Sequence, residues 1–118
     1  MAIKTESLQL DYDLLGDYTQ SLGVDVVKKM FDLYRQQSWV YYTDIEGALQ
    51  CDSAELWQEH CHKMKGAAAS VGLKSLYARL VIMEKSADCS IKKAQQLAEL
   101  NIHNQQAIAD FNDWIESL

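Results

Sequence analysis

The chain has 118 residues with 11 Lys and Arg against 17 Asp and Glu, so its formal net charge at pH 7 is −6. Hydrophobic residues make up 48% and charged residues 24%, which is typical of a single globular domain over residues 1–118 and not of a disordered chain. The acidic balance argues against nucleic-acid binding and against a polybasic membrane clamp, because both need an excess of Lys and Arg.

The cysteines and the apolar runs indicate the compartment. Cys51, Cys61 and Cys89 form no CxxC pair, which argues against a zinc ribbon and a disulfide framework. No signal-peptide core follows Met1, and no uncharged stretch approaches the ~20 residues that a membrane-spanning helix needs. We therefore expect a soluble cytoplasmic domain with free thiols and no membrane association.

The first two predicted helices cover residues 12–22 and 24–50. Proline is absent and glycine occurs five times, which favours long helices. Asp11 is the expected N-cap of the short first helix, and Gly23 is its expected stop. The second helix carries an apolar stripe spaced alternately by four and three residues, namely Val27, Phe31, Tyr34, Ser38, Tyr42, Ile45 and Leu49.

A third helix is predicted over residues 53–71. The run Asp52-Ser53-Ala54-Glu55 has the form of a capping box that begins at Asp52. Gly72 is the expected stop of this helix. Its apolar stripe consists of Trp57, Cys61, Met64, Ala68 and Val71.

Two more helices are predicted over residues 75–87 and 91–117, the second capped by Ser90. Their apolar stripes are Leu76, Leu80 and Met83 in one, and Leu97, Asn104, Ile108, Phe111 and Ile115 in the other. Four amphipathic helices with short connections predict an all-α fold. We expect an antiparallel four-helix bundle with a short extra N-terminal helix.

Several kinds of chemistry lack the residues they need. His60 and His62 are two positions apart, so on a helix they point about 200° apart and cannot bind one metal ion. No HExxH motif, EF-hand loop, GxSxG elbow or glycine-rich nucleotide loop occurs. We expect no metal site and no enzyme of these classes, and in particular neither ATP binding nor autokinase activity.

The three histidines differ in their expected surroundings. Relative to the buried direction of Met64, His60 lies about 40° away and His62 about 160° away. We expect His60 to be a partly buried packing residue with a hydrogen-bond partner, and His103 to be a plain surface residue. His62 is expected to be exposed.

His62 has unusual neighbours on its own face of the helix. Lys65 at i+3 supplies a positive charge suited to a phosphoryl group. Gly66 at i+4 costs about 1 kcal/mol of helix propensity relative to alanine, and with Ala69 it flattens the surface for a partner. A neutral imidazole can attack phosphorus. From these residues alone, a phosphorylation site and an ordinary exposed histidine are equally good interpretations.

The run His62-Lys63-Met64-Lys65-Gly66-Ala67-Ala68-Ala69-Ser70-Val71-Gly72 resembles the signature of histidine phosphotransfer (HPt) domains. That signature is His, any residue, an apolar residue, Lys, Gly, two small residues and a Gly ten positions after the His. The likeness extends more loosely over residues 10–118. The run Val71-Gly72-Leu73 is especially similar to HPt domains at the C-terminal end of hybrid sensor kinases.

The resemblance implies a role for each matching residue. His62 would accept the phosphoryl group through Nε2, Lys65 would lie near the phosphoryl oxygens, and Gly66 would make room for the partner. The chain would take the group from a receiver-domain aspartate and pass it to another receiver's aspartate, without kinase activity. Mg²⁺ would belong to the receiver, so no cofactor is expected here, and a monomer is the default.

Receiver domains of response regulators and hybrid kinases would dock on the face around His62, beside part of the second helix. The expected docking residues are Gln58, Glu59, Lys63 and Ala69. Trp39 and Tyr41 are either an exposed apolar rim of this face or partly buried against the short first helix. If the sequence is a complete gene product, the resemblance implies a free-standing phosphocarrier. The alternative function is a non-phosphorylated helical adaptor that only binds receiver or kinase domains.

Overall fold

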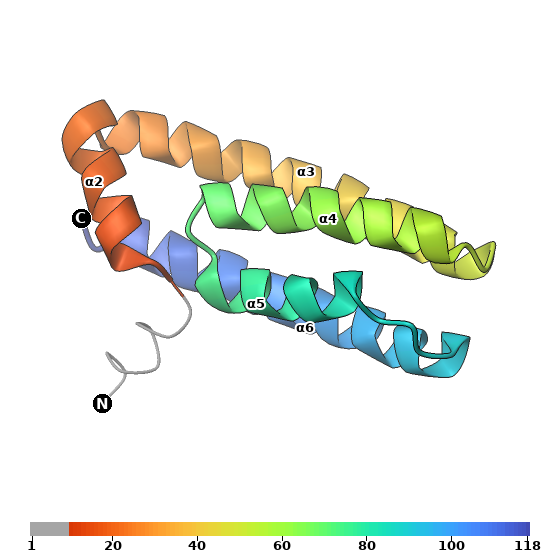
Figure 1. Ribbon diagram of the computed structural model, residues 1–118. Coiled ribbons are helices and arrows are strands. Elements are labelled where there is room, and N and C mark those ends of the chain that lie inside the picture. The colour runs from red at the N-terminus through yellow and green to blue at the C-terminus, as the bar shows by residue number, and fades with distance from the viewer. Residues whose placement is uncertain (1–9) are drawn as a thin grey trace.

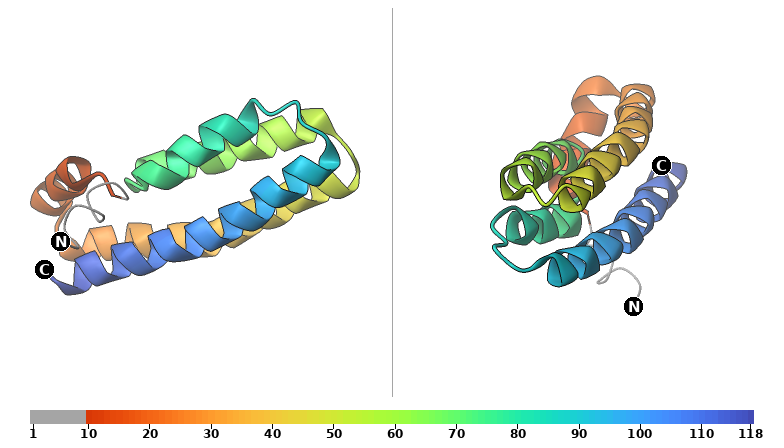
Figure 2. Two further views of the ribbon diagram at one scale, coloured as in Figure 1. Left: turned by 90° about the horizontal axis from the view of Figure 1, so that it is seen from below. Right: turned by 90° about the vertical axis from the view of Figure 1, so that its right-hand side faces the viewer.

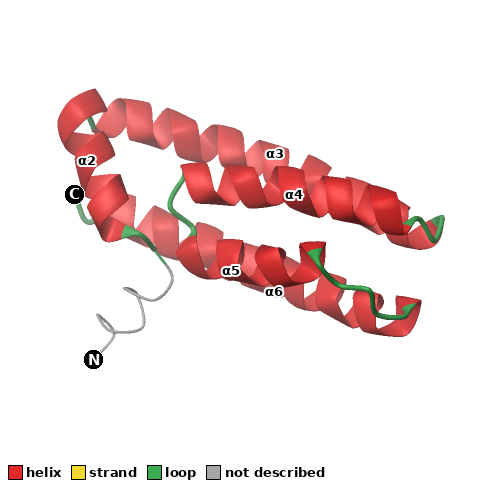
Figure 3. Ribbon diagram, in the orientation of Figure 1, coloured by secondary structure: helices red, strands yellow, loops and turns green. Residues whose placement is uncertain are grey.

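The computed structural model describes residues 10–118. The first nine residues of the expected domain lie outside the described residues, and so does the segment on which the absence of a signal peptide was predicted. Its helices are α2 (Tyr12–Leu22), α3 (Val24–Gln50), α4 (Ala54–Ser70), α5 (Lys74–Glu84) and α6 (Ser90–Glu116). Only short loops separate them (Figure 3), and none of residues 10–118 belongs to a β-strand. The predicted all-α class is confirmed.

The helices α3 to α6 form the antiparallel four-helix bundle that the sequence predicts, and α2 lies across one end of it (Figure 1). α4 packs against α3 on one side and against α5 on the other, while α6 closes the bundle against α3 and α5 (Figure 2). α4 therefore has one neighbouring helix on each flank and an outer face between them.

The two turns at the α2 end have the capping residues that the sequence predicts. The Asp11 carboxylate accepts a hydrogen bond of 3.1 Å from the backbone N–H of Leu14, and Gly23 ends α2 with φ +88°. Gly72 follows α4 with φ +71°, and a Cβ at this position would lie 3.1 Å from Leu15. Gly72 is thus required both by the backbone conformation and by the close packing of α2 on the α4–α5 turn.

The predicted cap of α4 is wrong by one residue. Ser53, not Asp52, is the N-cap, and its hydroxyl accepts a 3.1 Å hydrogen bond from the backbone N–H of Leu56. Asp52 instead adopts a left-handed conformation with φ +54°. The Ser53 N–H binds the Ala48 carbonyl at 3.0 Å, so Asp52 takes the place that glycine often takes after a helix end.

Two further boundaries differ from the prediction. α5 ends at Glu84, three residues before the expected end at 87, because the chain turns there toward α6. The Ser86 N–H binds the Met83 carbonyl at 3.1 Å, and the Ser86 hydroxyl donates to the Asp88 carboxylate at 3.0 Å. Cys89 is the N-cap of α6 and makes no side-chain capping bond, so Ser90 is the first helical residue and not the cap.

The predicted stripes form the core, in which Phe31 and Phe111 stack with their ring centroids 4.2 Å apart. Three stripe residues are only half-buried, and within α3 and α6 three buried residues lie outside the stripes. The half-buried ones are Tyr42, Leu49 and Ile108, and the additional ones are Ala48, Leu100 and Ala107.

The polar Asn104 in the α6 stripe joins α3 to α6. The Tyr34 hydroxyl donates to Asn104 Oδ1 at 2.6 Å, and Asn104 Nδ2 donates to the Ser38 hydroxyl at 3.1 Å. All three side chains are buried, where unpaired polar atoms would be costly.

Within residues 10–118, no helix has both the length and the apolarity to cross a bilayer.

Candidate functional site

His62 lies on the outer face of α4, with 66% of its side chain exposed, as the sequence predicts. The buried face of the same helix carries the four stripe residues Trp57, Cys61, Met64 and Ala68. Because these residues hold α4 against the core, the helix cannot rotate without exposing them, and the imidazole is kept at the surface.

Glu84, the last residue of α5, joins His62 to Lys65. One carboxylate oxygen, Oε2, lies 3.2 Å from His62 Nδ1, and the other, Oε1, lies 2.7 Å from Lys65 Nζ. The Glu84 and Lys65 side chains are only 15% and 20% exposed, so water screens this ion pair less than it screens a surface pair. An ion pair and a hydrogen bond thus join the three side chains across two helices, and we call them the His62–Glu84–Lys65 group.

The charge of Glu84 determines which ring nitrogen of His62 is free. The hydrogen bond from Lys65 is the main cause that lowers the pKa of Glu84, the bond to His62 adds to it, and partial burial opposes both. The carboxylate is therefore ionised at neutral pH and can only accept hydrogen bonds. Nδ1 must then carry the proton in this contact, which leaves the lone pair of the neutral ring on Nε2.

Glu84 was not predicted as a site residue, because spacing along one helix gives only neighbours on that helix, such as the expected docking residue Glu59 on α4. Glu59 is exposed. A signal for Glu84 did exist in the numbering, since His62 and Glu84 both lie eleven residues from Leu73 in the α4–α5 turn. In an antiparallel helix pair, positions equally distant from the turn lie at about the same height.

A pH-dependent contribution to stability is expected from Glu84. Because its pKa is lower in the folded chain than in the unfolded chain, the ion pair stabilises the fold above the unfolded value of about 4.3. This stabilisation is lost as the pH falls through the lowered pKa. Glu84→Gln should therefore cost about 1 kcal/mol at pH 7 and much less near pH 3, measured by urea unfolding. An equal cost at both pH values would contradict the ion pair.

Gly66 leaves an open surface one turn after His62. A Cβ at this position would have no atom within 4 Å, so the fold itself does not require glycine here. The open surface leaves room for the close approach of another protein, and this use of Gly66 stays a prediction.

We expect Gly66→Ala to stabilise the fold by about 0.5–1 kcal/mol, because alanine favours the helix, while transfer from a phosphorylated receiver becomes slower. Gly47→Ala is the matched control, since Gly47 also lies inside a helix with no atom within 4 Å of an added Cβ. It should give a similar stabilisation and an unchanged transfer rate. Thermal unfolding and single-turnover transfer measure the two effects, and equal transfer in both variants would contradict the role of Gly66.

The other two histidines are corrected in part. His60 is half-buried as predicted, but its buried Nδ1 has no hydrogen-bond partner among residues 10–118, so the expected partner is wrong. His103 is not a plain surface residue, because it is half-buried and its Nε2 lies 2.8 Å from Arg79 Nη2. Arg79 also pairs with Glu99 at 3.0 Å, which links α5 to α6.

Cys61 lies next to His62 in the sequence but faces the core and is fully buried. Burial raises the pKa of its thiol to about 12, and the nearby Glu84 carboxylate acts in the same direction. The sulfur therefore stays protonated at neutral pH and is not a competing nucleophile.

The expected docking residues Gln58, Glu59, Lys63 and Ala69 are all exposed. Beside the imidazole, α4 and the end of α5 enclose a shallow hollow. Its lining includes Gln58, Glu59, Lys63 and Glu84 together with His62 and Glu55. Ala69 lies outside this hollow, in the lining of another one by the α4–α5 turn.

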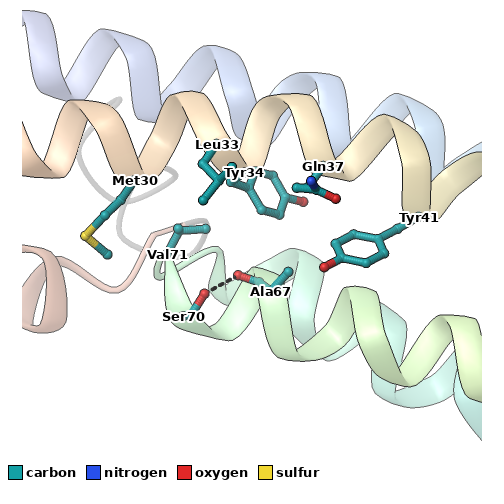
Figure 4. A pocket seen from close by; sticks show the side chains of 8 residues that line it. All are labelled: Met30, Leu33, Tyr34, Gln37, Tyr41, Ala67, Ser70 and Val71. Carbon is teal, nitrogen blue, oxygen red and sulfur yellow. Dashed lines mark hydrogen bonds between the residues drawn. The ribbon is translucent and has the colours of Figure 1, made fainter.

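Trp39 and Tyr41 have different surroundings. Trp39 is 63% exposed and stacks on Tyr42, with centroids 5.7 Å apart. Tyr41 is half-buried and lines a groove between α3 and α4, opposite Ala67 (Figure 4). Trp39 thus fits the exposed interpretation, whereas Tyr41 fits the partly buried one, with α4 and not α2 beside it. The groove is also lined by Met30, Leu33, Tyr34, Gln37, Ser70 and Val71.

Comparisons with known proteins agree with this geometry. The comparison with curated proteins found no match. The histidine-containing phosphotransfer domain of ArcB from Escherichia coli has a similar structure, with a TM-score of 0.85 and 19% identity over 96% of this chain and 98% of that domain. The run Val71-Gly72-Leu73 resembles the same domain of the Arc (anoxic redox control) hybrid sensor kinase.

Among residues 10–118, no three or more His, Cys, Asp or Glu side chains are grouped so that they could hold a metal ion.

The Hpt domain family matches residues 29–116, which include α4, α5 and the His62–Glu84–Lys65 group. The chain therefore belongs to the Hpt domain family, the histidine phosphotransfer modules of phosphorelays.

Proposed function

We propose that His62 accepts a phosphoryl group through Nε2 from a receiver-domain aspartate and passes it to the aspartate of another receiver. The contact between His62 Nδ1 and Glu84 Oε2 is the observation that supports this proposal most directly. It leaves the lone pair on the second nitrogen of an exposed ring, where a partner can reach it.

In the proposed step, the Nε2 lone pair attacks the phosphorus of the aspartyl phosphate. The Nε2–P bond forms as the P–O bond breaks, and the electron pair of that bond leaves with the receiver's carboxylate. The ring keeps its Nδ1 proton and gains a positive charge, which the ionised Glu84 stabilises as a carboxylate stabilises the imidazolium of a hydrolase triad. Transfer to the second receiver reverses these changes.

Lys65 would stabilise the charge that spreads over the phosphoryl oxygens in a loose, in-line transition state. It reaches the site from the turn of α4 that follows His62, already ordered by its bond to Glu84. The chain itself would contribute positioning and these two charges. The Mg²⁺ used in transfer would come with the acidic pocket of the receiver, so no cofactor is assigned to this chain.

The receiver would dock over the open surface of α4, where Gly66 and Ala69 allow close approach and Gln58, Glu59 and Lys63 border the ring. A groove between α3 and α4, lined on the α4 side by Ala67 and Ser70, offers further surface for the receiver (Figure 4). We propose that a single copy of the chain suffices for docking and that the relay operates in the cytoplasm, where free thiols such as Cys51 and Cys89 persist. A mere adaptor would not need the ordered His62–Glu84–Lys65 group.

The test is phosphoryl transfer in solution. Incubation with a phosphorylated receiver domain should label the chain with phosphate that is labile in acid and stable in base, as a phosphohistidine is. ATP and Mg²⁺ alone should give no label. Labelling by ATP alone would contradict the absence of kinase activity, and binding of the receiver without any labelling would favour the adaptor.

A further inference from the structure

A buried hydrogen bond lies directly behind the His62–Glu84–Lys65 group. The Trp57 indole N–H of α4 donates to the backbone carbonyl of Met83 at 2.7 Å. Trp57 is 1% exposed, and Met83 is the residue before Glu84. This bond therefore joins α4 to the last turn of α5, one residue from the carboxylate that contacts the imidazole.

The last turn of α5 has little else to hold a carboxylate in this position. Glu84 is the final helical residue, where the helix dipole disfavours a negative charge. Its partners His62 and Lys65 are both on α4, so their distances depend on how the end of α5 sits against α4. Trp57 lies five residues before His62 on that same helix and contacts the end of α5 directly.

The indole is itself held from a third helix. Lys93, in the first turn of α6, places its ammonium 5.2 Å from the centroid of the Trp57 ring, a distance typical of cation–π interactions. The indole N–H binds the Met83 carbonyl of α5, while the Lys93 ammonium of α6 lies over the ring. Trp57 thus connects α4, α5 and α6 behind His62.

We propose that Trp57 is a positioning residue for phosphotransfer, which sets the register of Glu84 against His62 and thereby keeps the proton on Nδ1. The inference rests on the proposed role of His62. It adds that the reactivity of the exposed ring depends on a buried indole N–H that touches neither substrate nor partner.

Trp57→Phe removes the donor and keeps an aromatic ring in the core. The Met83 carbonyl retains the Ser86 N–H at 3.1 Å, so the substitution does not leave that carbonyl unpaired and the fold should survive. We expect transfer from a phosphorylated receiver to slow about three- to tenfold, as misplacement of a reacting group does. Nitrogen-15 NMR of the His62 ring should show a mixture of tautomers in place of the Nδ1–H form.

Trp114→Phe is the matched control, because Trp114 is a half-buried aromatic that packs on Phe111 at the far end of α6. It should leave both the transfer rate and the tautomer unchanged. An equal loss of rate in both variants, or an unchanged rate and tautomer in Trp57→Phe, would overturn the proposal. If His62→Gln is still labelled, the proposed function fails instead, which is a separate result.

Two further variants test whether Trp57 acts through Glu84. In the Glu84→Gln background, adding Trp57→Phe should slow transfer no further, whereas additive losses would overturn the proposal. Lys93→Met keeps the indole N–H and removes only the ammonium group that lies over the ring. It should shift the tautomer balance in the same direction by a smaller amount, and no shift would contradict the role of α6, even if Trp57→Phe does not fold.

Discussion

His62→Gln should abolish labelling of the chain by a phosphorylated receiver domain. Glutamine is close in size and polar, so the exposed position on α4 tolerates it and the fold remains intact. It has no nitrogen lone pair that can attack phosphorus at neutral pH, because its amide nitrogen is conjugated with the carbonyl. The loss should be complete and not partial, since no other described group has the geometry of His62.

His60→Gln and His103→Gln are the controls for this result. His60 is half-buried on another side of α4, and His103 is bound to Arg79 between α5 and α6. Both variants should retain most of the labelling. Labelling that persists in His62→Gln and disappears in His60→Gln or His103→Gln would move the phosphoacceptor to that histidine. Circular dichroism of all three variants confirms that the comparison is between folded proteins.

Lys65→Ala should slow phosphoryl transfer about 10- to 100-fold while the bundle stays folded. The substitution removes the lysine charge of the His62–Glu84–Lys65 group and leaves the Glu84 carboxylate with His62 as its remaining partner in the group. The pKa of Glu84 should rise, because the bond from Lys65 is the main cause that lowers it. We expect a loss of stability of about 1–2 kcal/mol at pH 7, since a partly buried charge loses its counter-charge.

Lys28→Ala is the matched control for the charge, because Lys28 is an exposed lysine near the start of α3. Its removal changes the net charge by the same amount and should alter neither transfer nor stability appreciably. Stopped-flow or quenched single-turnover transfer, with urea unfolding in parallel, separates the two effects of Lys65→Ala. An unchanged transfer rate would show that Lys65 serves the fold through Glu84 and not the phosphoryl group.

The exposure of His62 could be predicted from the sequence of α4 alone. Its exposure, its distance of one turn from Lys65 and Gly66, and the burial of Met64 on the opposite face all follow from about 100° of rotation per residue. These relations hold within a single helix whatever lies beside it. The bundle and the helix order follow in the same way from stripes of apolar residues, each of which must be covered by another helix.

Helix ends are less predictable, because several neighbouring residues can each serve as the capping residue. Asp52 and Ser53 can both cap a helix, and the chain uses Asp52 for the left-handed turn and Ser53 for the cap. Ser90 is likewise a good capping residue, but the crossing from α5 to α6 begins the helix one position earlier, with Cys89 as the cap.

The charge and the tautomer of the site were decided only by the tertiary structure. Within α4 the sequence determined an exposed imidazole, a lysine and an open surface, since these depend on helical periodicity alone. Which carboxylate meets the imidazole depends on how α5 aligns with α4, and that alignment involves the α4–α5 turn at Gly72 and the bond from Trp57 to Met83. Glu84 is twenty-two residues from His62 in the chain, a separation that no rule of one helix can connect.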